Sequence, residues 1–166
     1  MFEEVMGIPA HPLLVHAAVV FVPLLALLAV GYAFVPVIRP HTRWVLGLLA
    51  VGAPISALFA KLSGDAFFER MRANGRVTEG FVPVLEEHQS FGDMTLYASL
   101  VLGVLALALV YVVAPRAAAA QAAAGAGRSR VVSLALGALT LIAAGVSLYY
   151  VFRTGDSGAK AVWEGS

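Results

Sequence analysis

The stretch LLVHAAVVFVPLLALLAVGYAFVPVI, from Leu13 to Ile38, contains no Asp, Glu, Lys or Arg. Only His16, Pro23 and Pro36 interrupt its apolar character. About 20 helical residues, each rising roughly 1.5 Å, cross a hydrocarbon core of about 30 Å. The run is continuous instead of alternating in steps of two, which indicates a helix rather than a half-buried strand. We therefore predict a membrane-spanning helix here.

Three further apolar runs have the same character. They extend from Trp44 to Ala60, from about Met94 to Ala114, and from Val131 to Phe152. The whole chain agrees with them, because 60% of its 166 residues are hydrophobic and only 13% are charged, against about 25% charged in soluble domains. In lipid, only helices and closed barrels satisfy every backbone hydrogen bond. We predict an all-α fold, an integral membrane four-helix bundle forming one domain over residues 1–166, with spans near 12–36, 43–63, 88–114 and 130–153.

The segment before the first run differs from a secretory signal peptide. It carries Glu3 and Glu4 and no Lys or Arg, whereas a signal begins with a basic region and has an apolar stretch of about 7–15 residues. The run is also too long for a signal, so we expect it to be retained as a span.

Charge is distributed unevenly between the two sides that four spans would create. The side with the short connections carries only basic charges: Arg39, Arg43, Arg116, Arg128 and Arg130. The side with the termini and the long connection carries every Asp and Glu, together with the remaining Lys and Arg. Basic residues in short loops favour the cytoplasm. We therefore expect the short loops inside and both termini outside.

The four histidines are the only ring-nitrogen ligands, and the absence of cysteine excludes thiolate sites. An ionisable residue inside a span usually faces the bundle interior and is a functional candidate, so we expect His16 to point inward. Pro12 favours an extended His11 and suits the first helical position, which places His11 at the lip of the helix. Five residues separate the two rings by roughly 140° around a helix, so they do not form one two-ligand motif.

The segment LEEHQSFGDMT, before the third run, supplies a second polar feature on the outer side. His88, Gly92, Thr95 and Ser99 recur at steps of three and four, which places them on one helix face. We expect this face to point into the bundle. The candidate ligand pair is then His16 with His88, and His11 is the alternative to His16.

The segment RTGDSGAKAVW follows the fourth run. Its Gly-Asp-Ser-Gly string predicts a turn. We expect Arg153 to pair with an outer acid and Trp163 to anchor the chain at the membrane interface.

Four segments in this order resemble those of the small bacterial four-span membrane protein family DUF2231: GIPAHPLLVHAAVVFVPLL, SGDAFFERM, EEHQSFGDM and RTGDSGAKAVW. The resemblance covers nearly the whole chain and implies a multi-pass protein of the bacterial cytoplasmic membrane. The family typically carries histidines that match His11, His16 and His88. Many members have a further histidine where this chain has Asp156. Some relatives occur fused to, or beside, cytochrome-type domains, which implies redox work.

Three functions remain open from the sequence. The first is a b-type haem near the outer face, held by His16 and His88 or by His11 and His88, and acting in electron transfer with a redox partner or a quinone. The second is a divalent-metal site in which the same histidines act with Asp65, Glu87 or Asp156. The third is a non-catalytic accessory subunit. No motif of an enzyme or of a nucleic-acid-binding protein is present, so we expect neither catalysis nor nucleic-acid binding; the partner common to all three functions is the lipid bilayer.

Overall fold

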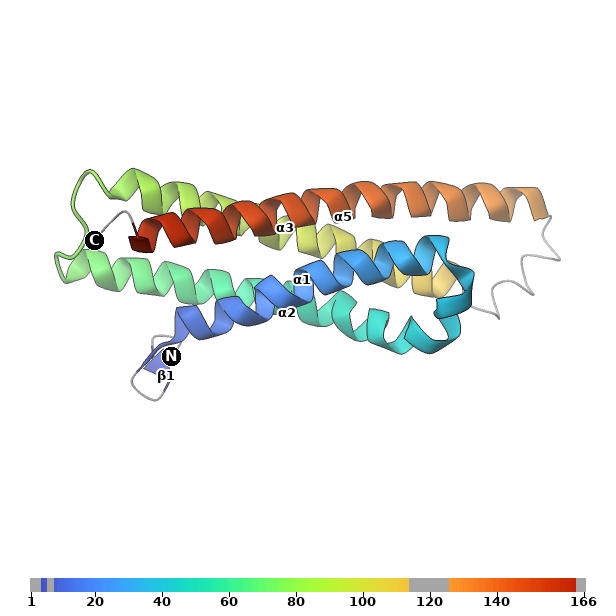
Figure 1. The fold of residues 1–166 in the computed structure, drawn as a ribbon, viewed down its shortest axis with the longest axis horizontal. Helices are drawn as coiled ribbons and strands as arrows, with labels where there is room; N and C mark the ends of the chain where they lie inside the picture. The colour runs from blue at the N-terminus through green and yellow to red at the C-terminus, as the bar shows by residue number, and fades with distance from the viewer. Residues whose placement is uncertain (1–3, 6–7, 114–125, 164–166) are drawn as a thin grey trace.

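Four long helices form a bundle in the computed structural model of the chain (Figure 1), which describes residues 4–5, 8–113 and 126–163. The helices are α1 (Ala10–Phe34), α2 (Arg39–Ala73), α3 (Val82–Val112) and α5 (Ala126–Trp163). A short 3-10 helix, η1 (Pro36–Ile38), joins α1 to α2. Strands β1 (Glu4–Val5) and β2 (Ile8–Pro9) form one small antiparallel pair ahead of α1. The predicted all-α fold is confirmed.

The helices are arranged as two hairpins that run in the same direction. The first hairpin is α1 with α2, the second is α3 with α5, and they meet through α2 against α3 and α1 against α5. Helices α1 and α3 therefore lie diagonally across the bundle. Both termini and the connection between α2 and α3 lie at one end (Figure 1), which we call the termini end. The opposite end, with η1, is the loop end.

The outer surface of the bundle is apolar along most of its length. Large side chains that face away from the core include Leu27, Leu48, Val104, Ile142 and Phe152, each more than 60% exposed. Four helices are long and apolar enough to cross a membrane. A soluble protein rarely exposes so continuous an apolar surface, so this surface faces lipid and the chain is a multi-pass membrane protein.

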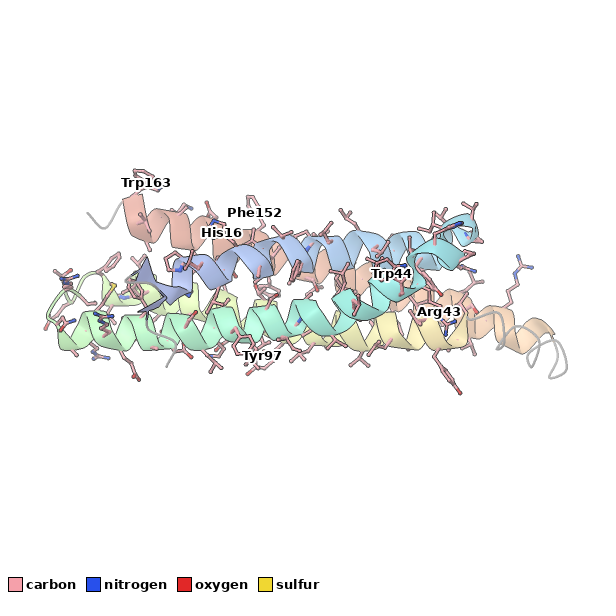
Figure 2. All side chains as sticks on the ribbon, turned by 90° about the horizontal axis from the view of Figure 1, so that it is seen from below. His16, Arg43, Trp44, Tyr97, Phe152 and Trp163 are labelled. Carbon is pink, nitrogen blue, oxygen red and sulfur yellow. The ribbon has the colours of Figure 1, made fainter. Side chains whose placement is uncertain are left out.

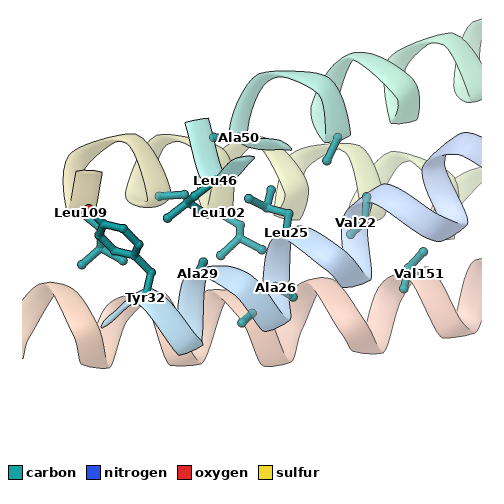
Figure 3. Close-up of a cluster of buried hydrophobic side chains, with 13 residues drawn as sticks. Val22, Leu25, Ala26, Ala29, Tyr32, Leu46, Ala50, Leu102, Leu109 and Val151 are labelled. Carbon is teal, nitrogen blue, oxygen red and sulfur yellow. The ribbon is translucent and has the colours of Figure 1, made fainter. Parts of the chain in front are cut away.

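The core consists of small and medium-sized side chains stacked along the bundle axis (Figure 3). Tyr32 is its largest fully buried residue, and alanines bring the helices close together. The closest approach is at Gly103 of α3, where an added Cβ would lie 2.5 Å from the carbonyl oxygen of Ala50 on α2. Van der Waals packing over small residues is what holds helices together in lipid, so glycine at position 103 fixes the spacing of α2 and α3.

Helices α2 and α3 extend beyond the predicted spans at the termini end. The amine of Lys61 on α2 lies 2.8 Å from the carboxylate of Asp93 on α3 and 2.9 Å from that of Asp65. From Lys61, α2 runs on for about 18 Å to Ala73 at 1.5 Å per residue. The exposed tryptophans Trp44 and Trp163 lie at opposite ends of the bundle (Figure 2), as expected of interfacial anchors.

At the loop end, Arg39 closes the first helix. Its guanidinium donates to the carbonyl oxygens of Tyr32 and Ala33 at 2.8 and 2.7 Å, two of the acceptors left without partners where α1 ends. The described residues do not include Glu3, Ala114 or Arg116.

Candidate functional site

Two histidines from diagonal helices meet at the termini end. His11 lies on α1 and His88 on α3, their ring centroids are 6.3 Å apart, and their planes are inclined by 79°. The helix containing His11 begins at Ala10 rather than at Pro12, so His11 is already helical instead of lying extended at the lip. The first turn of α1 thereby directs this ring at α2 and α3.

His11 is held by three consecutive turns of α2. Its Nδ1 lies 3.0 Å from the carbonyl oxygen of Ala60 and 3.2 Å from Oγ of Ser63. The ring rests on Gly64, where an added Cβ would come within 2.9 Å of the ring Cε1. Phe67 stacks on the ring, with the centroids 6.3 Å apart and the planes nearly parallel.

His88 is held by α5 through a matching set of contacts. Its Nδ1 lies 2.9 Å from Oγ of Ser157, and the ring rests on Gly158, where an added Cβ would come within 2.9 Å of Cε1. The Gly-Asp-Ser-Gly string that predicted a turn is therefore helical, and that prediction is wrong. The glycine belongs inside a helix because it leaves room for the ring of a neighbouring helix.

The hydrogen bonds favour one position for the ring proton. The carbonyl oxygen of Ala60 can only accept, so His11 Nδ1 donates to it. The hydroxyls of Ser63 and Ser157 lie 2.9 and 3.1 Å from the carbonyl oxygens of Ala60 and Thr154 in their own helices, and donation to these oxygens leaves each hydroxyl to accept from a histidine Nδ1. We therefore expect both neutral rings to carry the proton on Nδ1, which would leave the Nε2 lone pair available.

His16 does not face His88, contrary to the prediction. It is exposed on the outside of α1 (Figure 2), and its Nδ1 bonds to the carbonyl of Pro12 in the same helix. The physical reason is the angle of roughly 140° between residues five apart, which turns His16 outward once His11 points inward. The alternative pair, His11 with His88, is the one that the structure brings together.

The remaining predicted residues are engaged elsewhere. Asp65 pairs with Lys61 and accepts from Gln89. Glu87 pairs with Arg153 at 3.6 Å, which confirms the expected outer partner of that arginine. Asp156 pairs with Lys160 of its own helix. No group of three or more His, Asp or Glu that could hold a metal ion occurs among the described residues, and the fourth histidine, His41, lies in the first turn of α2 at the loop end.

The predicted inward face of α3 is confirmed. Thr95 and Ser99 are buried below His88, and the hydroxyl of Thr95 lies 2.8 Å from that of Thr154 on α5. An added Cβ at Gly92, one turn from the ring of His88, would meet nothing within 4 Å.

An apolar groove opens sideways between α1 and α5. Its volume is about 500 Å³, within the range of small-molecule sites. Its lining residues are Val19, Pro23, Leu148, Val151, Phe152, Gly155 and Asp156. The last two directly precede, in the sequence of α5, the Ser157 and Gly158 that hold His88.

Sequence reasoning missed the four residues that hold the rings: Ser63, Gly64, Ser157 and Gly158. The available signal was the Ser-Gly dipeptide, which occurs both after the second apolar run and after the fourth. The same dipeptide at the end of both runs could have indicated an equivalent role in both places.

Comparison with known proteins gives one match. A family model described as "Predicted membrane protein (DUF2231)" matches residues 7–166. No curated protein and no solved structure matches the chain.

Proposed function

The chain belongs to the DUF2231 family of predicted membrane proteins, and from this premise we propose that it binds one b-type haem through His11 and His88 and carries electrons at the outer membrane face. The single observation that carries the proposal is the facing pair of half-buried imidazoles, each anchored through Nδ1. We propose an electron carrier rather than an enzyme, in the bacterial cytoplasmic membrane.

The anchoring of Nδ1 fits the requirements of an iron ligand. Ligating histidines almost always donate their second ring N–H to a carbonyl, carboxylate or other acceptor, which fixes the tautomer and the ring orientation. Ser63 and the Ala60 carbonyl play this part for His11, and Ser157 plays it for His88. Histidines on facing helices of a bundle are a common way to build a cofactor site.

The two rings lie close enough that both would hold one metal-containing group, with their centroids 6.3 Å apart. The divalent-metal alternative is less well supported, because Asp65, Glu87 and Asp156 are paired with cations instead.

The residues around the pair suit transfer to a lipid-soluble partner. Haem iron between two imidazoles exchanges single electrons. Phe67 covers His11 on the α2 side, while the groove between α1 and α5 opens to the lipid next to the segment that holds His88. We propose a quinone as the redox partner, entering this apolar groove with its ring toward Asp156.

A difference spectrum tests this function. Protein expressed with haem supplied and purified in detergent is expected to show the sharp reduced-minus-oxidised bands of six-coordinate haem after addition of dithionite. A short-chain quinol is expected to produce the same bands. Absence of any haem band in folded protein rejects the haem proposal, and reduction by dithionite but not by quinol rejects the quinone.

We further propose that the termini end faces outward. In the sequence of the two short connections, every charged residue is an arginine. Cytoplasmic loops are enriched in basic residues. A protease-cleavable tag after Ser166 is expected to be cut in intact spheroplasts. The same tag inserted in the alanine-rich stretch 117–127 is the control and is expected to be protected; the reverse pattern contradicts this orientation.

A further inference from the structure

The two hairpins hold their histidines in the same way. In each hairpin, the first helix supplies a histidine and the second supplies a Ser-Gly pair. The serine hydroxyl lies beside Nδ1 while donating to a carbonyl three residues earlier in its own helix. The glycine leaves the space that the ring occupies. One arrangement therefore occurs twice, as His11 with Ser63 and Gly64, and as His88 with Ser157 and Gly158.

The buried positions of the two hairpins coincide when these units are aligned. The offset between the first helices is 88 − 11 = 77 positions, and the offset between the second helices is 157 − 63 = 94 positions. With these offsets, every buried residue of α1 has a buried counterpart in α3: Ala18 and Thr95, Val22 and Ser99, Leu25 and Leu102, Ala26 and Gly103, Ala29 and Ala106, Tyr32 and Leu109.

Helices α2 and α5 correspond in part. The buried pairs are Leu46 and Thr140, Ala50 and Ala144, Ala53 and Ser147, Ala57 and Val151, Ser63 and Ser157. Pro54, Ser56 and Gly137 are buried without a buried counterpart. The register was set by the histidines and serines, and most of the buried positions agree with it. The hairpins run in parallel, so the axis that relates them runs along the bundle, as in transporters with parallel repeats.

The two hairpins differ at equivalent positions on the two sides of the bundle. Gly155 on α5 occupies the position of Lys61 on α2, and His16 on α1 occupies that of Asp93 on α3. The α2–α3 side is closed by the pair between Lys61 and Asp93, whereas the groove opens at Gly155 on the α1–α5 side. The two sides of the bundle therefore differ in what occupies equivalent positions.

We infer that the chain is a duplicated helical hairpin whose halves contribute equivalent half-sites on a common pseudo-two-fold axis, and that Ser63 and Ser157 are the positioning residues that hold His11 and His88 with Nε2 free for one shared ligand. The inference rests on the proposed function for the identity of that ligand, haem. The positioning itself is a property of the protein alone.

The test is ¹⁵N NMR of histidine-labelled full-length protein without haem, at a pH where imidazole is neutral. His11 and His88 are both expected as Nδ1–H tautomers, with assignments from His→Gln variants. Ser63→Ala is expected to shift only the His11 signals, and Ser157→Ala only those of His88. Ser99→Ala is the matched control, because this buried serine also donates to its own helix, at Leu96, and is expected to shift neither.

Haem titration supplies the second measurement. Each serine variant is expected to weaken haem binding by about 10–100-fold, the usual effect of removing the outer partner of a ligating histidine, and the two variants are expected to be similar. An Nε2–H tautomer at either histidine, or a serine variant that shifts neither ring, overturns the inference even if haem binds. Correct tautomers in a protein that binds no haem overturn the proposed function and leave the inference standing.

Discussion

His11→Ala and His88→Ala are each expected to abolish the six-coordinate haem spectrum. Each substitution removes one of the two imidazoles whose centroids lie 6.3 Å apart, so haem would keep one protein ligand. The loss of affinity is expected to exceed the roughly 10–100-fold caused by removing an outer partner of a ligand. The measurement is haem titration of each purified variant by absorption, and free imidazole is expected to restore the six-coordinate bands in either one.

His16→Ala provides the matched control on the same helix. His16 is exposed on α1 and hydrogen-bonds to Pro12 in its own helix, so the variant is expected to bind haem like the unchanged protein. If His16→Ala removes the spectrum while His11→Ala keeps it, the ligand pair is His16 with His88 and the geometry described above is not the binding geometry.

Gly103→Ala is expected to produce the largest loss of stability among single-methyl substitutions. The new Cβ would lie 2.5 Å from the carbonyl oxygen of Ala50 and 3.2 Å from the ring of Pro54. Both neighbours belong to the body of α2, which cannot yield without separating from α3. Overpacking of this kind costs about 1–3 kcal/mol, to be measured as a lower free energy of unfolding in detergent.

Gly145→Ala is the control for this substitution. Its Cβ would meet nothing within 4 Å, and alanine is favoured over glycine inside helices by about 1 kcal/mol in water. We expect unchanged or slightly higher stability. Equal losses in the two variants would mean that the close contact of α2 and α3 at Gly103 does not hold in the protein.

The fold was predictable because lipid leaves the backbone few alternatives. In lipid, only helices and closed barrels satisfy the backbone, and continuous apolar runs such as Leu13–Ile38 are typical of helices rather than alternating strands, so the four helices follow. The helix ends were less predictable. The thickness of the hydrocarbon core determines the length of each apolar run but not where the helix ends. Helix α2 continues as a polar helix to Ala73, and α3 begins at Val82, both outside the predicted spans.

The site was predictable in part. Helix geometry correctly separated His11 from His16 and placed His88 on an inward face with Thr95 and Ser99. The prediction of His16 as the ligand is wrong because the depth of a residue in the apolar run does not determine which way its side chain points. Direction depends on which neighbour offers space and a hydrogen-bond acceptor, and Gly64 and Ser63 offer both to His11.

The Ser-Gly pairs could not be recognised locally. Glycine followed by polar residues is usually a turn signal, and the Gly-Asp-Ser-Gly string has the composition of a turn. Only the packing of α5 against α3 shows that Gly158 accommodates the ring of His88. The contact joins residues far apart in sequence, so no local pattern encodes it.

The most direct measurement is the haem content and spectrum of the purified protein beside those of the variant that carries both His11→Ala and His88→Ala. We predict one six-coordinate, low-spin haem per chain in the unchanged protein and no such haem in the folded double variant. Haem absent from both proteins, or bound equally by both, would contradict the claim that these two histidines form a haem site.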